Sequence, residues 1–405
     1  MKEGLEYKKI AEQLGITLRA ARKWGQAIKR GGLLEPPMGR PKRGVFGTFS
    51  PQVSKSIDKM RPGAEGWGAK TLRVELEQDP SLSGQKLPSV RSIDNYLKAQ
   101  KRVRANWHAE PLPSEPVVPS SGPHDVWQLD AEGNKRVKGV GVVSMVNIGD
   151  TFTKTYVGSY PVQLGGNFNH LTKEHYQFVL RLSFREFGLC NRLQLDHESI
   201  FYDNTCTTPY PTPFHLWLLG LGVPPAFTPK AKPFKQGGVE RKHRTMHQQV
   251  CAGREFRGHA ELFAMCQQRR KRLNNDIPCR TLGNSPPLKR FPEAARSSRP
   301  YLADTEDELF DVKRIYDYLE TGHWNRTVVS NKSFSLGSQQ YYLNQAAPNS
   351  TLLVKFDPGT KMFACSDANG KLLGTVQPKG ISFKELCGDL QAFIRWVNDN
   401  HQLLL

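Results

Sequence analysis

Three acidic residues follow or open predicted elements, in positions where side chains from separate elements could converge. Asp130 ends the strand-like run VWQLD, Asp196 ends RLQLD, and Glu240 opens a predicted helix in GGVERKHRTM. Carboxylate oxygens are the ligands that Mg²⁺ and Mn²⁺ prefer. Two such ions about 4 Å apart suit phosphodiester chemistry, because one sharpens the attacking oxygen and the other stabilises the leaving oxygen. The pattern therefore predicts a site for two Mg²⁺ or Mn²⁺ ions.

Other acids and two histidines compete for roles in this site. The neighbouring acids are Glu132, Asp150, Glu198 and Asp203, and Glu198 is the alternative for a place in the triad because it follows Asp196 by two residues. His243 and His247 have a spacing that can bind zinc on a helix, but the glutamate of a zinc-protease motif is missing. We expect these histidines to contact phosphate or to lie on the surface.

The positive charge of the chain is concentrated in two regions. The formal net charge is +19, of which residues 1–60 carry +8 and residues 230–290 carry +11. Local cationic regions are expected where phosphates are neutralised. Within the second region, six cations flank the predicted site and are expected to oppose substrate phosphates: Lys230, Lys232, Lys235, Arg241, Lys242 and Arg244. Ordinary solvated helix faces are the alternative.

Cysteine usage and hydropathy indicate a cytosolic protein. The seven cysteines include no Cys-x-x-Cys pair, which favours reduced thiols over a metal or redox site. The first residues are polar, and no run of about 18 apolar residues occurs, so neither a signal peptide nor a membrane span is expected. The predicted location is the bacterial cytoplasm, with nucleoid association when the protein is bound to DNA.

The first 33 residues have the pattern of a helix-turn-helix. Two helical segments flank a glycine turn, and Thr17 is the expected N-cap of the second segment. The second helix of such a motif enters the major groove, so Arg19, Arg22 and Lys23 are predicted to lie near bases or phosphates. A plain helical hairpin is the alternative.

A second helix-turn-helix is predicted between two linkers. Residues 34–52 form a basic linker that could follow a DNA backbone through Arg40, Lys42 and Arg43. Residues 53–105 have helical patterns, and the last helix opens near Ser89 and is predicted to contact DNA with Ser89, Arg91 and Ser92. Residues 106–124 are a proline-rich linker.

The rest of the chain is predicted to form an α/β core followed by a β-rich region. In residues 125–253 the patterns indicate strands near 126–130, 139–148, 153–160, 192–197 and 223–228, and helices at 170–188, 214–221 and from 238. Residues 254–324 are a basic helical and proline-rich connector. Residues 325–382 are predicted to form a small β-barrel, and residues 383–405 a C-terminal helix.

Residues 123–290 resemble the retroviral-integrase superfamily of transposases, whose active sites contain an Asp-Asp-Glu triad. The resemblance is carried by HDVWQLDAEG, LQLDHESIFYDN, LGVPPAFTPKAKPFKQGGVERKHRTM and RLNNDIPCRTLGNSPP. It implies a ribonuclease-H-like core with Asp130, Asp196 and Glu240 as the triad. Two features differ from the common pattern: His197-Glu198 stand where Asn-Gly is usual, and the 43 residues between Asp196 and Glu240 are a longer interval.

A second resemblance covers the tail, which is similar to the C-terminal β-barrel of phage Mu transposase and its relatives. It implies a homo-oligomer on DNA and a separate ATPase that selects targets. The sequence thus predicts a multidomain α/β DNA transposase that binds element ends, exposes a 3′-hydroxyl and joins it to target double-stranded DNA. The alternatives are a DNA-binding regulator on an inactive integrase fold and a two-metal DNA nuclease.

Overall fold

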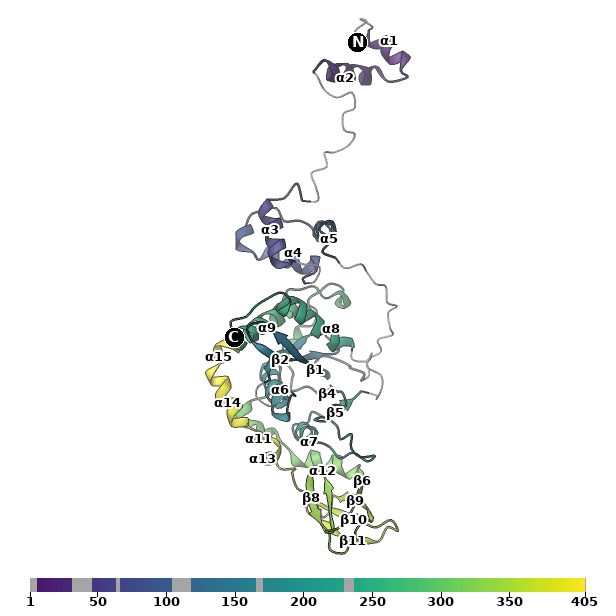
Figure 1. Cartoon of the computed structure of the whole chain (residues 1–405), viewed down its shortest axis with the longest axis vertical. Helices are drawn as coiled ribbons and strands as arrows, with labels where there is room; N and C mark the ends of the chain where they lie inside the picture. Colours follow the sequence, from purple (N-terminus) through teal and green to yellow (C-terminus); the bar gives the residue numbers. More distant parts are fainter. Residues whose placement is uncertain are drawn as a thin grey trace.

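The computed structural model describes residues 6–30, 46–62, 66–103, 118–164, 170–228 and 237–404 (Figure 1). Within these ranges no helix combines the length and the apolar character needed to cross a lipid bilayer. Six residues predicted to contact DNA lie outside the described ranges: Arg40, Lys42, Arg43, Lys230, Lys232 and Lys235.

The predicted N-terminal helix pair is present. Helices α1 (Tyr7–Gln13) and α2 (Leu18–Lys29) are joined by a short turn, and the Thr17 side chain accepts a hydrogen bond of 3.2 Å from a backbone N–H in the first turn of α2. This confirms the predicted cap. Leu14 and Trp24 are 61% and 46% exposed, so two helices alone do not bury the apolar residues of this segment.

A three-helix module follows. Its helices are α3 (Pro51–Met60), α4 (Ala69–Glu77) and α5 (Val90–Ala99), with a short 3₁₀ turn, η1 (Pro80–Leu82), between the last two. Each helix contributes its apolar face to one small core, as helical periodicity requires: Val53, Ile57, Leu72, Leu76, Leu82, Ile93, Tyr96 and Leu97.

Trp67 and Glu75 attach this module to the α/β core. The Trp67 indole N–H donates to the Gln249 carbonyl at 3.1 Å, and the Arg269 guanidinium lies 4.5 Å from the centre of the Trp67 ring. Glu75 forms ion pairs with Arg269 at 2.7 Å and with Arg272 at 3.1 Å. The module is therefore docked by one aromatic anchor and one acidic side chain.

A mixed five-stranded sheet forms the centre of the core. Its strands are β1 (Val126–Val137), β2 (Gly141–Asp150), β3 (Tyr156–Gln163), β4 (Arg192–Leu195) and β5 (Pro225–Phe227), in the order β3-β2-β1-β4-β5. The first three strands are antiparallel, and β4 and β5 run parallel to β1. The parallel strands require helical crossovers, which are α6 (Lys173–Phe187) and α7 (Pro213–Gly220). Every strand and helix predicted for this region is confirmed.

Helices cover both faces of the sheet. Side chains such as Trp127 and Leu129 point to the face covered by α6 and α7. Val143 and Met145 point to the other face, where α8 (Gly237–Met246), the π-helical turn η3 (His247–Cys251) and α9 (His259–Asn275) pack. Because α9 shares this apolar cluster, the predicted division after residue 253 does not correspond to a break in packing.

Short elements then lead away from the sheet. They are η4 (Arg280–Leu282), α10 (Pro287–Arg290), η5 (Pro292–Ala295), η6 (Ala303–Thr305), α11 (Glu306–Leu309) and α12 (Val312–Glu320). Glu306, fully buried, accepts two hydrogen bonds of 2.7 Å from Arg181 of α6 and one of 3.0 Å from the Trp217 indole. This buried pair joins the connector to the core.

The β-rich region, for which a small β-barrel was predicted, forms two separate sheets. Strands β6 (His323–Thr327), β9 (Thr351–Asp357), β10 (Met362–Ser366) and β11 (Leu372–Val376) form one sheet in the order β11-β10-β9-β6, and β7 (Ser333–Leu336) and β8 (Gln339–Tyr342) form a hairpin. Among the described residues no ladder links the two sheets. They pack through aromatic rings instead: Tyr341 of the hairpin lies 6.1 Å from Phe363 of the larger sheet.

The predicted single C-terminal helix is divided into three, α13 (Phe383–Leu386), α14 (Leu390–Asp399) and α15 (His401–Leu404). Gly388 has φ +62°, and a Cβ there would lie 2.5 Å from the Gln177 side-chain oxygen. Asp389 then caps α14 by accepting from the Ala392 N–H at 2.8 Å. A left-handed glycine followed by a new N-cap ends one helix and begins another. The last helices run back beside the core, where α15 contacts α9 (Figure 1).

Candidate active site

Asp130 and Asp196 are brought together by the register of β1 and β4. Gln128 pairs with Gln194 in this parallel ladder. The same register carried two residues further places Asp130 beside Asp196, on strands about 4.8 Å apart. Alternation puts both carboxylates on the α8 face of the sheet, because the intervening Leu129 and Leu195 point into the opposite core.

The two aspartates interact electrostatically. Burial raises the pKa of Asp196, and the negative charge of Asp130 raises it further, whereas a hydrogen bond of 2.9 Å from the Glu198 N–H opposes the shift. Asp130 accepts a hydrogen bond of 3.0 Å from the Ala131 N–H and is 21% exposed. Two carboxylates crowded in this way are stabilised by any cation bound between them.

Glu240 lies on the helix that covers these aspartates. It is in the first turn of α8, and its side chain is exposed. Residues three apart on a helix are neighbours, so Glu240 shares a flank of α8 with His243, which reaches Asp130. Across the described ranges no three His, Cys, Asp or Glu side chains meet at metal-ligand distances, so Glu240 and the two aspartates do not form a closed ligand set in this structure.

His243 is buried between acidic side chains, which corrects its predicted surface position. It is 6% exposed, and its Nδ1 lies 2.7 Å from Asn147 Nδ2, on the β2 residue that pairs with Asp130. His243 Nε2 lies 3.3 Å from Asp130 Oδ2 without hydrogen-bond geometry, and Nδ1 lies 4.0 Å from Glu132. In the sequence, His243 follows Glu240 by three residues, or about one helical turn. This spacing is the signal that could have indicated a position beside Asp130.

Lys242 also points into the protein, so the prediction that it faces DNA is wrong. It is 8% exposed, and its Nζ donates to the carbonyls of Lys154 at 2.8 Å and Thr155 at 3.2 Å. The ammonium also lies 3.8 Å from the centre of the Tyr156 ring. Burial lowers the pKa of Lys242 to about 7. Arg241 and Arg244, on the same helix, are exposed as predicted.

The sequence analysis did not predict that Tyr176 and Glu198, close to Asp196, form a hydrogen-bonded pair. The hydroxyl of buried Tyr176, on α6, donates to Glu198 at 2.7 Å. Burial and the charges of Asp196 and Asp130 raise the pKa of Glu198, while the bond from Tyr176 lowers it. Burial is also the largest cause of the raised pKa of Tyr176. Glu198 is thus held towards α6 by a partner of its own.

The other predicted DNA contacts lie on helix surfaces. Arg19, Arg22 and Lys23 are exposed on α2, and Arg91 is exposed on α5. The Ser89 hydroxyl accepts a hydrogen bond of 3.2 Å from the Ser92 N–H and lies 3.0 Å from the Ser92 hydroxyl, so both serines take part in the N-cap of α5.

No family model matches the chain. A solved structure of the catalytic core domain of BIV integrase is 15% identical, with a TM-score of 0.31, and the match covers 42% of this chain and 95% of that one. A simian T-cell lymphotropic virus intasome in complex with PP2A regulatory subunit B56 gamma is 12% identical, with a TM-score of 0.34 and coverage of 77% and 100%. Because both TM-scores are below 0.5, the account of the site depends on the geometry of this chain.

Proposed function

We propose that this protein is a DNA transposase of the integrase type, which cleaves element ends to expose a 3′-hydroxyl and joins that hydroxyl to target DNA. The observation that carries the proposal is the register that places Asp130 beside Asp196 on the sheet face covered by the helix of Glu240. Convergent carboxylates of this kind suit two-metal phosphoryl transfer.

The donor set fits hard divalent cations. Asp130, Asp196 and Glu240 offer only carboxylate oxygens, the ligands expected for Mg²⁺ or Mn²⁺. The raised pKa of Asp196, caused by burial and by the charge of Asp130, is the electrostatic strain that bound cations relieve. In this proposal the three carboxylates hold two ions, which supply an activated attacking oxygen and a stabilised leaving oxygen.

Neighbouring side chains position this carboxylate set. His243, held by Asn147 at 2.7 Å, lies against Asp130 and limits the orientations of its carboxylate. Exposed Arg241 and Arg244 stand on the same helix as Glu240, where they can contact phosphates of the DNA. The helical modules α1–α2 and α3–α5 would recognise element ends, and the joined complex would be a homo-oligomer assisted by a target-selecting ATPase.

One observation favours a second function. Glu240 is exposed and does not form a metal-ligand group with the two aspartates. The same arrangement is expected of a DNA-binding regulator on an inactive integrase fold. A binding protein of this kind needs no third carboxylate at the aspartates.

A strand-transfer assay tests the proposal. Labelled, pre-cleaved element-end DNA and a plasmid target are incubated with Mg²⁺ or Mn²⁺ and with wild type, Asp130→Asn, Asp196→Asn or Glu240→Gln. We expect joined product from wild type and none from the three variants, with end binding retained. Asp367→Asn, a change in a turn of the β-rich region, is the matched control and should join normally. An uncleaved element end is assayed in parallel to report cutting. End binding by wild type without cutting or joining would favour the regulator, and cutting of the uncleaved end without joining would favour a nuclease.

A further inference from the structure

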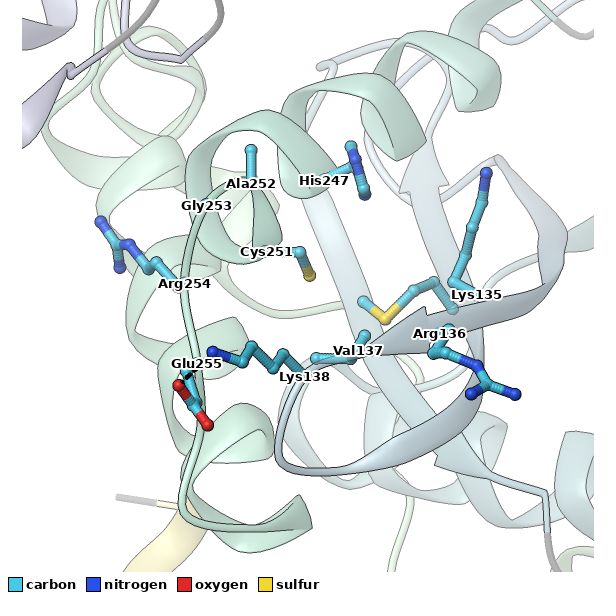
Figure 2. Close-up of a pocket in the computed structure, with 11 residues that line it drawn as sticks. Lys135, Arg136, Val137, Lys138, His247, Cys251, Ala252, Gly253, Arg254 and Glu255 are labelled. Atoms are coloured by element: carbon cyan, nitrogen blue, oxygen red, sulfur yellow. Dashed lines mark ion pairs between the residues drawn. The ribbon is translucent and has the colours of Figure 1, made fainter.

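A hollow in the protein surface lies beyond the aspartates along β1. It has a volume of about 520 Å³ and is formed by the β1–β2 hairpin on one side and by η3 and residues 252–255 on the other. Figure 2 shows the side chains of Lys135, Arg136 and Lys138 on the hairpin and those of His247 and Arg254 on the opposite wall. We call this hollow the hairpin pocket.

The two walls of the hairpin pocket are held together. The Phe256 N–H donates to the Lys138 carbonyl at 3.0 Å, and Lys138 Nζ pairs with Glu255 at 2.6 Å (Figure 2). Gly139 has φ +82°, and a Cβ there would lie 1.7 Å from the Phe256 carbonyl oxygen. Backbone contact this close requires glycine, so the pocket is a fixed part of the fold.

The pocket carries an excess of positive charge. Lys135, Arg136, Lys138 and Arg254 line it together with one acid, Glu255. Lys135 is neutralised in part by Glu132 at 2.8 Å, outside the pocket. Arg136 is exposed and forms no ion pair with any described residue, so its guanidinium is available for an external anion.

Its position relates the pocket to the proposed active site. The β1–β4 ladder ends at Gln128 and Gln194, so among the described residues no strand pairs with β1 on that side beyond Asp130. A β-bulge interrupts β1 between Glu132 and Lys135, and Asp130 and Arg136 pair with Asn147 and Val142, which lie five residues apart on β2 and so about 16 Å apart. The exposed Arg244 lies on α8, one turn before His247. A strand of duplex DNA rises about 3.4 Å per nucleotide, so this path corresponds to about five nucleotides.

We propose that the hairpin pocket binds the sugar–phosphate backbone of double-stranded DNA, about five nucleotides from the phosphate that reacts at Asp130 and Asp196. Naming that reacting phosphate rests on the proposed function, whereas the backbone contact itself does not. Arg136 and Arg254, which form no ion pair with any described residue, contact phosphate oxygens, and Met145 and Cys251 supply an apolar floor that makes no hydrogen bonds to bases. The pocket therefore adds affinity without sequence specificity.

The salt dependence of binding tests this contact. The affinity of the full chain for a duplex oligonucleotide is measured by fluorescence anisotropy over a series of salt concentrations. Each phosphate contact contributes about −0.9 to the slope of log K against log salt. We expect Arg136→Ala to reduce the slope by about one and Arg136→Ala with Arg254→Ala by about two. Arg136 is exposed and unpaired, so the single variant remains informative if the double variant is unstable.

The control residue lies in the segment between η3 and α9 but does not line the hairpin pocket. Arg257 has a side chain that is 94% exposed and 3.6 Å from Glu261, and Arg257→Ala should leave the slope unchanged. An unchanged slope in Arg136→Ala, or no duplex binding by wild type, overturns the proposal. If Arg136→Ala loses self-association while its salt slope stays normal, the proposal is also overturned. In that case the pocket binds an acidic segment of a second copy of the chain.

The same assay separates this inference from the proposed function. Asp130→Asn, combined with Arg136→Ala, should show the same reduction in slope as Arg136→Ala alone. If wild type fails to join DNA while this reduction persists, the proposed function fails and the pocket stands.

Discussion

Burial of His215 makes a quantitative prediction about stability and pH. The ring is 5% exposed on α7, and its centre lies 5.5 Å from that of Phe227 and 4.9 Å from that of Tyr318. Burial lowers the pKa of His215 to about 3, from its usual 6.5. The native state therefore favours the neutral ring.

The sign and size of the effect follow from proton binding. Between pH 6.5 and pH 3 the unfolded chain binds a proton at His215 that the native chain does not bind, so stability falls as the pH falls. Each pH unit in this window costs about 1.4 kcal/mol. Lowering the pH from 7 to 5 should therefore remove about 2 kcal/mol from the free energy of unfolding through this one group.

Urea unfolding at pH 7 and pH 5, followed by circular dichroism, measures this loss. His215→Phe retains an aromatic ring but cannot titrate, so its loss between the two pH values should be smaller than that of wild type by about 2 kcal/mol. His323→Gln, at an exposed histidine, should behave as wild type does. Equal pH dependence in wild type and His215→Phe would refute the burial of a neutral ring between α7, β5 and α12.

Three further predictions concern the packing and charge around the site. Glu306→Gln leaves the buried arginine of α6 without its counter-charge, and urea unfolding should show a loss of about 3–5 kcal/mol; a loss below about 1 kcal/mol would contradict the buried pair. Lys242→Met should bind duplex DNA with the wild-type salt slope, whereas Arg241→Ala should reduce the slope by about one; the reverse order would restore Lys242 as a DNA contact. Tyr176→Phe removes the buried hydroxyl that donates to the half-buried Glu198 carboxylate and should cost about 1.5–3 kcal/mol in the same unfolding assay; an unchanged free energy of unfolding would exclude that hydrogen bond.

The strands and helices of the core could be predicted because their patterns are local. Alternating apolar residues in VWQLD and RLQLD mark strands, and these become β1 and β4. Which strands are neighbours, and in which register, depends on contacts between distant segments. Asp196 follows β4 as predicted, whereas β1 continues past Asp130 to Val137, so Asp130 lies within its strand and not at its end. That the two aspartates lie side by side is visible only in the sheet.

The predictions that failed have the same origin, because they depend on contacts between segments that are distant in the sequence. Lys242 looks like any cation in a basic run, and nothing local shows that the carbonyls of Lys154 and Thr155 lie within its reach. In the β-rich region Asp357 and Asp367 form turns in which their side chains accept hydrogen bonds from backbone N–H groups two residues on. Turn residues define hairpins, but they do not determine whether a ladder closes into a barrel.

The convergence of Glu240 with the two aspartates is the central claim, and anomalous diffraction from Mn²⁺ tests it most directly. Crystals of the DNA-bound protein should contain two Mn²⁺ peaks about 4 Å apart, with ligands from Asp130, Asp196 and Glu240. Peaks coordinated by Glu198 in place of Glu240, or DNA bound at the aspartates without Mn²⁺ at either one, would contradict the account.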